Sequence, residues 1–377
     1  MDVVIYGMGS GGKYVFNEIK NAVNSKISIL GWIDNYADVT SFCGLPVMKE
    51  EEFFQCGKKA DAVVVTIFNQ RSAQDAVVSL LAHEYTMIYI VSRINLVGKL
   101  PVLDETGDFS IHMKHWKKVE PVFPRVQYPV VDQCNLNCRG CSSYANIAKP
   151  AFVTCEEFEQ DMQAMKKKIK KIELFVFYGG EPLLHPELSS LIRIFRKIYP
   201  VTPVQIISNG LLVPKISQEL AETIRESGDI TLDITQYPPT RKMLDKIVET
   251  LEKNAIDYWL GEPLEEFFRI LIKEEQDSRK VYERCKETFY CKTIRKGKMY
   301  ACPTIPFTFE RLDYFGIHLD EREKEESYFD LHNGSENVWD ILVRLREPFG
   351  LCKFCQVDQE KFPWCIGEAK RSDWIKE

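Results

Sequence analysis

The sequence has no apolar run long enough to cross a bilayer and no surplus of basic residues. Its longest apolar stretch, residues 62–68, has the length of a strand, whereas a membrane helix needs about 20 residues. Lysine and arginine number 49 against 55 aspartates and glutamates, which argues against a protein that grips long nucleic acid. The first residues lack the basic and apolar regions of a secretory signal. These absences predict a cytoplasmic protein that binds neither membrane nor nucleic acid.

Cysteine is the unusual part of the composition. The chain has 377 residues, 45% of them hydrophobic and 28% charged, which is ordinary for a globular protein of two or three domains. Twelve cysteines in a reducing compartment do not predict a disulfide framework, so clustered spacing argues for metal. Three clusters stand out: Cys134, Cys138 and Cys141; Cys285, Cys291 and Cys302; Cys352, Cys355 and Cys365. The isolated Cys43, Cys56 and Cys155 are predicted to be packing residues.

The periodicity divides the chain into three segments. Residues 1–118 alternate strands and helices, which predicts a parallel sheet with helices on its faces. Residues 119–275 repeat this pattern, with strands at 126–131, 173–177, 204–207 and 230–234 and helices at 155–172 and 188–199, enough for a partial barrel. Residues 276–377 have weak periodicity and six cysteines, which predicts a small domain that is stabilised by metal.

A C-x₃-C-x₂-C triplet follows the strand at residues 126–131. Cys134, Cys138 and Cys141 can hold three irons of a cubane and leave the fourth iron without a protein ligand. That open position would make the cluster a reaction site. From spacing alone, a zinc knuckle with a remote fourth ligand, or three incidental cysteines, stays an alternative.

The triplet and two later motifs resemble the radical S-adenosylmethionine (SAM) superfamily. FYGGEP (177–182) matches that superfamily's GGEP motif, and SNG (208–210) matches its SNG/TNG motif. The three motifs occur in order, each at the carboxyl end of a predicted strand. The resemblance implies a radical SAM partial (β/α)₆ barrel, in which an electron from a reduced 4Fe–4S cluster splits SAM into a radical that abstracts hydrogen from substrate.

The resemblance also implies a role for each motif residue. The cluster ligands would be Cys134, Cys138 and Cys141. The contacts to SAM would come from Gly179, Gly180 and Glu181 to its amino group and from Ser208 and Asn209 to its carboxylate or ribose. Asp233 and Tyr237, at the end of a later strand, either face the same cavity or belong to the turn at Pro238 and Pro239.

The C-terminal cysteines resemble the auxiliary-cluster domains called SPASM or Twitch. There are too few for two further clusters, so one additional 4Fe–4S cluster is expected. The first choice of ligands is Cys291, Cys302, Cys352 and Cys355, followed by Cys285 and then Cys365. A zinc site built from the same thiolates is the alternative, because paired cysteines also suit tetrahedral zinc.

A glycine loop near the start fits the dinucleotide-binding pattern. Gly7, Gly9 and Gly12 lie between a strand and a helix, and Asp34 closes the second strand. The region also resembles the Rossmann-like domains of sugar acyltransferases and capsule-biosynthesis proteins. Nucleotide-sugar binding, NAD(P) binding and a scaffold without ligand are the three hypotheses for this domain.

Together these features predict a three-part α/β enzyme. We expect radical SAM chemistry of the oxidoreductase or isomerase type on a small polar molecule such as a nucleotide sugar or glycan precursor, with a flavodoxin or ferredoxin as electron donor. The outcome would be epimerisation, dehydrogenation or rearrangement. The alternatives are a radical SAM enzyme that modifies peptides and a zinc-stabilised binding module without enzymatic activity.

Overall fold

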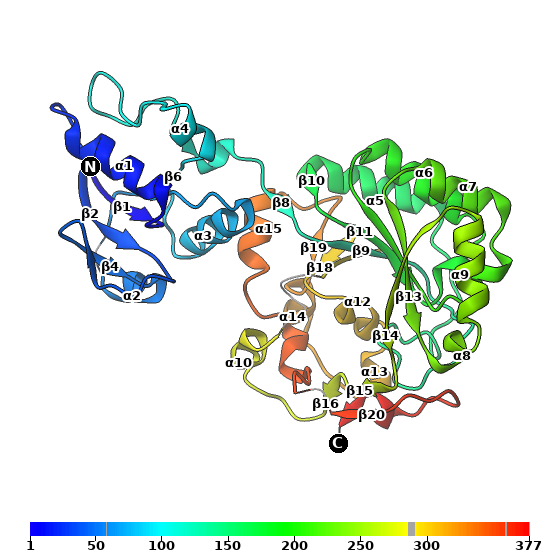
Figure 1. Ribbon diagram of the computed structural model, residues 1–377. Helices are drawn as coiled ribbons and strands as arrows, with labels where there is room; N and C mark the ends of the chain where they lie inside the picture. The colour runs from blue at the N-terminus through cyan, green and yellow to red at the C-terminus, as the bar shows by residue number, and fades with distance from the viewer. Residues whose placement is uncertain (58, 286–290, 359, 377) are drawn as a thin grey trace. The chain divides into compact units, whose positions relative to one another are not determined.

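The computed structural model describes residues 1–57, 59–285, 291–358 and 360–376. The chain divides into two compact units, Met1–Pro121 and Val122–Glu377, and each is described by itself. Both are mixed α/β structures (Figure 1). In the part of the chain that the structure describes, no helix combines the length and hydropathy needed to cross a membrane.

The first unit is built on a mostly parallel sheet in the order β3-β4-β2-β1-β5-β6-β7. Its strands are β1 (Asp2–Tyr6), β2 (Ser28–Ile33), β3 (Ser41–Phe42), β4 (Leu45–Met48), β5 (Ala62–Val65), β6 (Ile88–Ile90) and β7 (Lys114–His115). Its helices are α1 (Ser10–Asn21), α2 (Glu50–Gln55), α3 (Gln70–Ala82), α4 (Arg93–Val97) and the 3₁₀ turn η1 (Trp116–Lys118). The central strands β1 and β5 are almost wholly buried, as strands of a covered parallel sheet should be.

The second unit contains a larger sheet in the order β14-β13-β12-β11-β9-β17-β18-β19. The sheet strands are β9 (Val126–Val131), β11 (Phe175–Gly179), β12 (Val204–Ser208), β13 (Ile230–Gln236), β14 (Asp257–Pro263), β17 (Lys292–Arg295), β18 (Lys298–Tyr300) and β19 (Phe329–Asp330). The short strands outside it are β8 (Val122–Phe123), β10 (Lys171–Ile172), β15 (Glu266–Phe268), β16 (Leu271–Ile272), β20 (Lys361–Pro363) and β21 (Ile375–Lys376).

Helices connect the parallel strands of this sheet and cover one of its faces (Figure 1). The longer helices are α5 (Cys155–Lys168), α6 (Leu188–Ile198), α7 (Gln218–Glu226) and α9 (Leu244–Lys253). The shorter ones are α8 (Pro238–Arg241), α10 (Ser278–Glu283), α12 (Thr304–Phe309), α13 (Leu312–Phe315), α14 (Glu321–Glu325), α15 (Val338–Arg344), η2 (Pro182–Leu184), η3 (Val213–Lys215), η4 (Gly350–Phe354) and η5 (Arg371–Asp373). Stacked rings such as Phe175 and Phe195, with centroids 4.0 Å apart, join the helices to the sheet.

Two features differ from what the periodicity suggests. The helix predicted at residues 155–172 ends at Lys168, because Ile169 turns to extended backbone and residues 171–172 pair with β8. The cysteine-rich segment also adds strands to the large sheet, since β17 pairs in parallel with β9. The boundaries at residues 118/119 and 275/276 stay predictions.

Candidate active site

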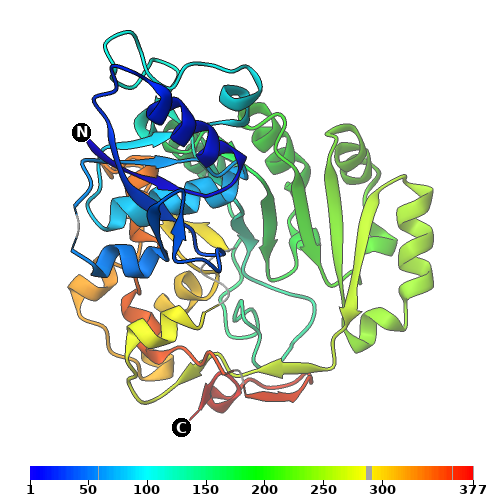
Figure 2. The same cartoon turned by 60° about the vertical axis from the view of Figure 1, so that its left-hand side comes forward.

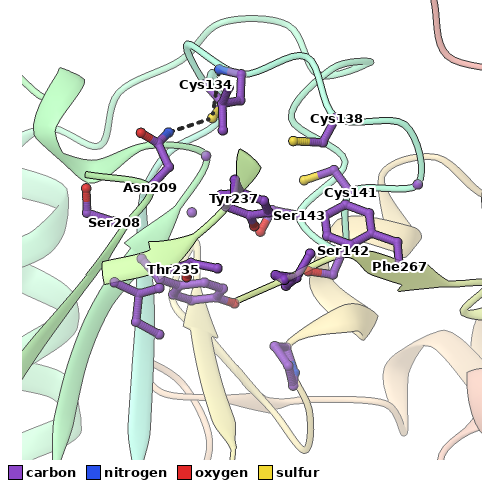
Figure 3. A pocket seen from close by; sticks show the side chains of 18 of the residues that line it. Cys134, Cys138, Cys141, Ser142, Ser143, Ser208, Asn209, Thr235, Tyr237 and Phe267 are labelled. Atoms are coloured by element: carbon purple, nitrogen blue, oxygen red, sulfur yellow. Dashed lines mark hydrogen bonds between the residues drawn. The ribbon is translucent and has the colours of Figure 1, made fainter. Parts of the chain in front are cut away.

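The three cysteines of the C-x₃-C-x₂-C triplet border one cavity of about 460 Å³. They lie on the loop that follows β9, and the cavity opens at the carboxyl ends of β9, β11 and β12 (Figure 3). Parallel strands bring their carboxyl ends to one edge of a sheet, so motifs that are distant in sequence meet there. Gly179, Gly180, Ser208 and Asn209 also line this cavity.

Three thiolates are a donor set of the kind that a 4Fe–4S cluster requires. Among the described residues, no three histidine, cysteine, aspartate or glutamate side chains converge closely enough to hold one metal ion. A cubane has its irons at separate corners, so each thiolate binds its own iron and the sulfurs need not share one centre. Three sulfurs that border one cavity of this size meet that requirement.

Burial keeps these thiols protonated when no metal is bound. Burial raises the pKa of Cys134 to about 11 and that of Cys138 to about 12. Hydrogen bonds act in the opposite direction: the Leu136 N–H and the Asn209 amide reach the Cys134 sulfur at 3.4 and 3.6 Å. Thiolate is the form that binds iron, so these donors favour the ligating state.

The two glycines of the GGEP motif let β11 approach the cysteine loop. A Cβ at Gly179 would overlap the Val131 carbonyl, and one at Gly180 would overlap the Gln133 carbonyl. Gly179 also has φ +132°, where side chains are rarely tolerated. The Gly180 N–H donates to Val131 O at 2.8 Å and fixes the approach. The glycines therefore position the backbone from which Cys134 projects.

Glu181 lies behind the wall of this cavity. It is fully buried, and it accepts from the Ser208 hydroxyl and the Asn209 N–H at 2.8 Å and from the Leu183 N–H at 3.0 Å. The carboxylate thus joins the end of β11 to the end of β12. Its contact with the SAM amino group stays a prediction, whereas its hold on Ser208 and Asn209 is direct.

Asn209 connects the β12 motif to the cysteine loop. Its side-chain amide nitrogen donates to the Asn135 side chain at 2.6 Å, and its side-chain carbonyl accepts from the Leu211 N–H at 3.0 Å. The Ser208 hydroxyl donates a hydrogen bond to Glu181 and accepts one from the Gly210 N–H. The predicted residues of the β12 motif thus contact Glu181 and the cysteine loop, while their contacts with SAM stay predictions.

Several cavity residues were not found from the motifs. Gln127 of β9 is 4% exposed and lines the cavity. Arg125 also lines it, and its Nε is buried without a partner there. Phe267 is a further wall residue, and Tyr237, which has alternative interpretations in the sequence, lines the cavity as well. The signal for Gln127 was a polar residue within an otherwise apolar buried strand.

Of the C-terminal cysteines, Cys365 lies apart from the others named as auxiliary ligands. Burial raises the pKa of Cys302 to about 12, and Cys352 and Cys285, which are within electrostatic range of it, raise it further. Cys291 lines the cavity, and Cys355 pairs with Leu271. Cys365 lies elsewhere. Its carbonyl accepts from Arg139 N at 2.9 Å, beside the first cysteine triplet.

The glycine loop of the first unit is held by Asp34. The carboxylate accepts from the Met8 N–H at 2.9 Å and from two N–H groups of its own turn. Gly12 allows α1 to pack on the strand, because a Cβ there would overlap the Gly7 carbonyl. Gly9, the N-cap of α1, has open space around its Cβ position. The backbone N–H groups that follow Gly9 form the amino end of a 12-residue helix.

Comparison with protein families identifies the domain that contributes the three cysteines to the cavity. Residues 128–259 match the model of the radical SAM superfamily. The chain contains a radical SAM domain. Domains of this superfamily bind SAM at a 4Fe–4S cluster, and the prediction of a radical SAM domain is confirmed.

Curated relatives match the radical SAM domain only in part. The GTP 3′,8-cyclase of Clostridium acetobutylicum is 27% identical over 153 residues, which cover 37% of this chain and 46% of the cyclase. The 7,8-dihydro-6-hydroxymethylpterin dimethyltransferase of Methanocaldococcus jannaschii is 30% identical over 107 residues, which cover 27% of this chain and 20% of the transferase. The chain spans about half the length of the cyclases it matches.

Solved structures give a similarly partial match. BtrN in complex with AdoMet and 2-DOIA is 16% identical, with a TM-score of 0.40 over 63% of this chain and 94% of BtrN. Streptococcus suis SuiB bound to S-adenosylmethionine is 14% identical, with a TM-score of 0.31 over 43% of this chain and 37% of SuiB.

Proposed function

We propose that the radical SAM domain binds its 4Fe–4S cluster through Cys134, Cys138 and Cys141 and acts on a small polar substrate. The observation that carries this proposal is the shared cavity, which brings these sulfurs together with Asn209. When bound, the cluster supplies the electron that splits the sulfonium of SAM. The protein's own contribution is to hold both groups, orient the substrate and exclude water.

The residues of the GGEP and SNG motifs that border the cavity would orient SAM. Ser208 and Asn209 are fixed by Glu181, so they meet the polar end of SAM without further ordering. Backbone groups of Gly179 and Gly180 border the same space and have no side chain to obstruct the amino group. Tyr237 and Phe267 form an aromatic wall with ring centroids 6.0 Å apart, which would exclude water from the reacting atoms.

The polar lining supports a hydrophilic substrate. The Gln127 amide has both a donor and an acceptor and lines the cavity, and the Arg125 guanidinium adds a charged group with a buried, unpartnered Nε. Arg125 also donates to Gln205 at 3.1 Å, and Gln205 donates to Asp233 at 2.8 Å. Such a chain of donors and acceptors suits hydroxyl-rich molecules, so we keep a nucleotide sugar or glycan precursor as the proposed substrate class.

We further propose one auxiliary 4Fe–4S cluster on four of the cysteines from residue 285 to 355. The first choice remains Cys291, Cys302, Cys352 and Cys355, with Cys285 as the competitor. Support comes from the mutual electrostatic influence of Cys302, Cys352 and Cys285 and from the position of Cys291 on the cavity wall. Cys365 is excluded from this set because it lies at Arg139.

For the first unit we propose a Rossmann-like nucleotide site at the amino end of α1. The open surroundings of Gly9 and the free N–H groups expected of a helix start favour a phosphate. Asp34 would then shape the loop as well as meet a ribose, since it already binds the Met8 N–H. A nucleotide sugar held here is the proposed ligand, with NAD(P) as the competing one.

Anaerobic reconstitution with iron and sulfide tests the main proposal. We expect a brown protein with about eight irons per chain that cleaves SAM reductively to 5′-deoxyadenosine. Cys138→Ala should lose the cleavage, whereas Cys43→Ala, an exposed cysteine of the first unit, should retain it. A colourless protein that contains only zinc, or a Cys138→Ala variant with normal cleavage, would overturn the assignment.

Deuterated SAM tests the substrate class. The reduced enzyme should exchange label with a nucleotide sugar and not with short peptides. Exchange with peptides alone would replace our proposal with the peptide-modifying alternative. If the label exchanges with a nucleotide sugar, Gln127→Leu should raise the KM for that sugar. Cleavage of SAM without the sugar should be unchanged, because Gln127 is proposed to contact the substrate only.

A further inference from the structure

The end of the chain lies along the cysteine loop of the radical SAM domain. Ile366 pairs with Cys138 in an antiparallel bridge, and the Gly367 N–H donates to Asn137 O at 3.0 Å. Arg139 forms an ion pair with Asp373, which is only 4% exposed. In Figure 2 the red C-terminal strands lie beside the teal loop that follows β9. Residues separated by more than 220 positions therefore share one small structure.

Trp364 approaches a cluster ligand from this segment. Its indole Nε1–H donates to the Cys138 sulfur with a nitrogen–sulfur distance of 3.2 Å. The indole ring packs against Tyr237, with centroids 5.7 Å apart, and the Trp364 backbone N–H donates to Glu265 O at 2.8 Å. Backbone and ring are thus both fixed, which directs the N–H at the sulfur.

We propose that Trp364 sets the reduction potential of the cluster at which SAM binds. This inference rests on the proposed ligation by Cys138. Reduction adds negative charge to the cluster, part of which resides on the ligand sulfurs, so a donor aimed at one sulfur stabilises the reduced form more than the oxidised form. Trp364 is a positioning residue in this sense. It acts through Cys138 and is not among the residues that line the cavity.

The consequence concerns how readily the cluster accepts an electron. Loss of the Trp364 N–H should make the reduction potential more negative. At a fixed potential, the ratio of reduced to oxidised cluster should fall by about tenfold, which corresponds to about 59 mV for a one-electron couple. A weak reductant would then reduce the variant incompletely.

The experiment is an EPR-monitored redox titration of reconstituted wild type and Trp364→Phe. Phenylalanine keeps an aromatic ring beside Tyr237 and removes only the N–H donor and part of the ring. The matched control is Trp374→Phe, because the Trp374 indole donates to the Cys141 carbonyl at 2.7 Å and not to a sulfur. We expect a more negative potential for Trp364→Phe and no such shift for Trp374→Phe. An unchanged potential for Trp364→Phe, or equal shifts in both variants, would overturn the proposal.

A second measurement needs no variant that must assemble a cluster. In wild type grown with ¹⁵N-indole tryptophan, pulsed EPR of the reduced cluster should detect one nitrogen coupled through an exchangeable proton. Absence of that coupling overturns the proposal. Wild type that forms no cubane at all instead refutes the proposed function, so the two failures are distinguishable.

Discussion

Arg295 and Asp132 form a buried, two-pronged ion pair just before the cysteine loop. Two guanidinium nitrogens donate to the two carboxylate oxygens at 2.8 and 2.9 Å, and the side chains are 7% and 13% exposed. Glu310 accepts from the same guanidinium at 2.9 and 3.1 Å. Arg295 belongs to β17 and Asp132 follows β9, so the pair reinforces the pairing of these strands beside Cys134.

Arg295→Met should therefore destabilise the second unit and loosen the cysteine loop. Removing one partner leaves buried Asp132 with an uncompensated charge, which costs about 3–5 kcal/mol in comparable pairs. Denaturant unfolding measures this loss. Arg193→Met is the control, because its ion pair with Glu219 is 55% and 66% exposed and should change stability by about 1 kcal/mol or less. Equal effects of the two variants would contradict the argument.

Gly180→Ala should displace the cysteine loop. The new Cβ overlaps the Gln133 carbonyl, which is backbone and can move only together with Cys134. We expect a loss of about 1–3 kcal/mol in unfolding free energy and reduced iron uptake. In Gly261→Ala the Cβ meets ordinary contact, 3.4 Å from Ile234 O, so this control should bind iron normally. Normal iron uptake by Gly180→Ala would refute the role given to this glycine.

Glu181 should make the stability of the metal-free protein depend on pH. Burial raises the pKa of Glu181 to about 7, against an ordinary 4.5. The folded state therefore holds this proton more tightly than the unfolded state does. Stability from the protonated group is complete below about pH 4.5 and is lost as pH rises through about 7. At 1.36 kcal/mol per unit, the loss amounts to about 3 kcal/mol.

Chemical unfolding of wild type and Glu181→Gln between pH 5 and 8.5 measures this effect. The difference in unfolding free energy between the two proteins should change by about 3 kcal/mol across that range, because glutamine does not titrate. Glu173→Gln, at an exposed position before β11, is the surface control. A constant difference between wild type and Glu181→Gln would show that Glu181 titrates normally.

The residues of the radical SAM motifs could be predicted from the sequence because each follows a strand of one parallel sheet. Cys134, Gly180 and Asn209 are far apart along the chain, yet strand order alone brings them to one edge. Trp364 could not be predicted in this way. Its contact with Cys138 spans 226 positions and depends on how an irregular segment folds, for which no periodicity exists.

The position of Cys365 could not be predicted from the sequence either. Spacing groups Cys365 with Cys352 and Cys355, but spacing carries no information on direction once regular strands end. The structure turns Cys365 toward Arg139 instead, where Gly367 also pairs with the cysteine loop. Gln127 could not be predicted for another reason: a single polar residue in a buried strand forms no motif.

Iron content distinguishes Cys365 from the proposed auxiliary ligands. Cys302→Ala should lower the reconstituted protein from about eight irons to about four, because Cys302 lies with Cys352 and Cys285 in the proposed auxiliary site. Cys365→Ala is the matched control. It should keep about eight irons, since Cys365 lies beside Arg139 and is not a proposed ligand of either cluster. Reductive cleavage of SAM should persist at the remaining cluster of Cys302→Ala. Full iron in Cys302→Ala, or loss of four irons in Cys365→Ala, would show that the auxiliary ligands were assigned wrongly.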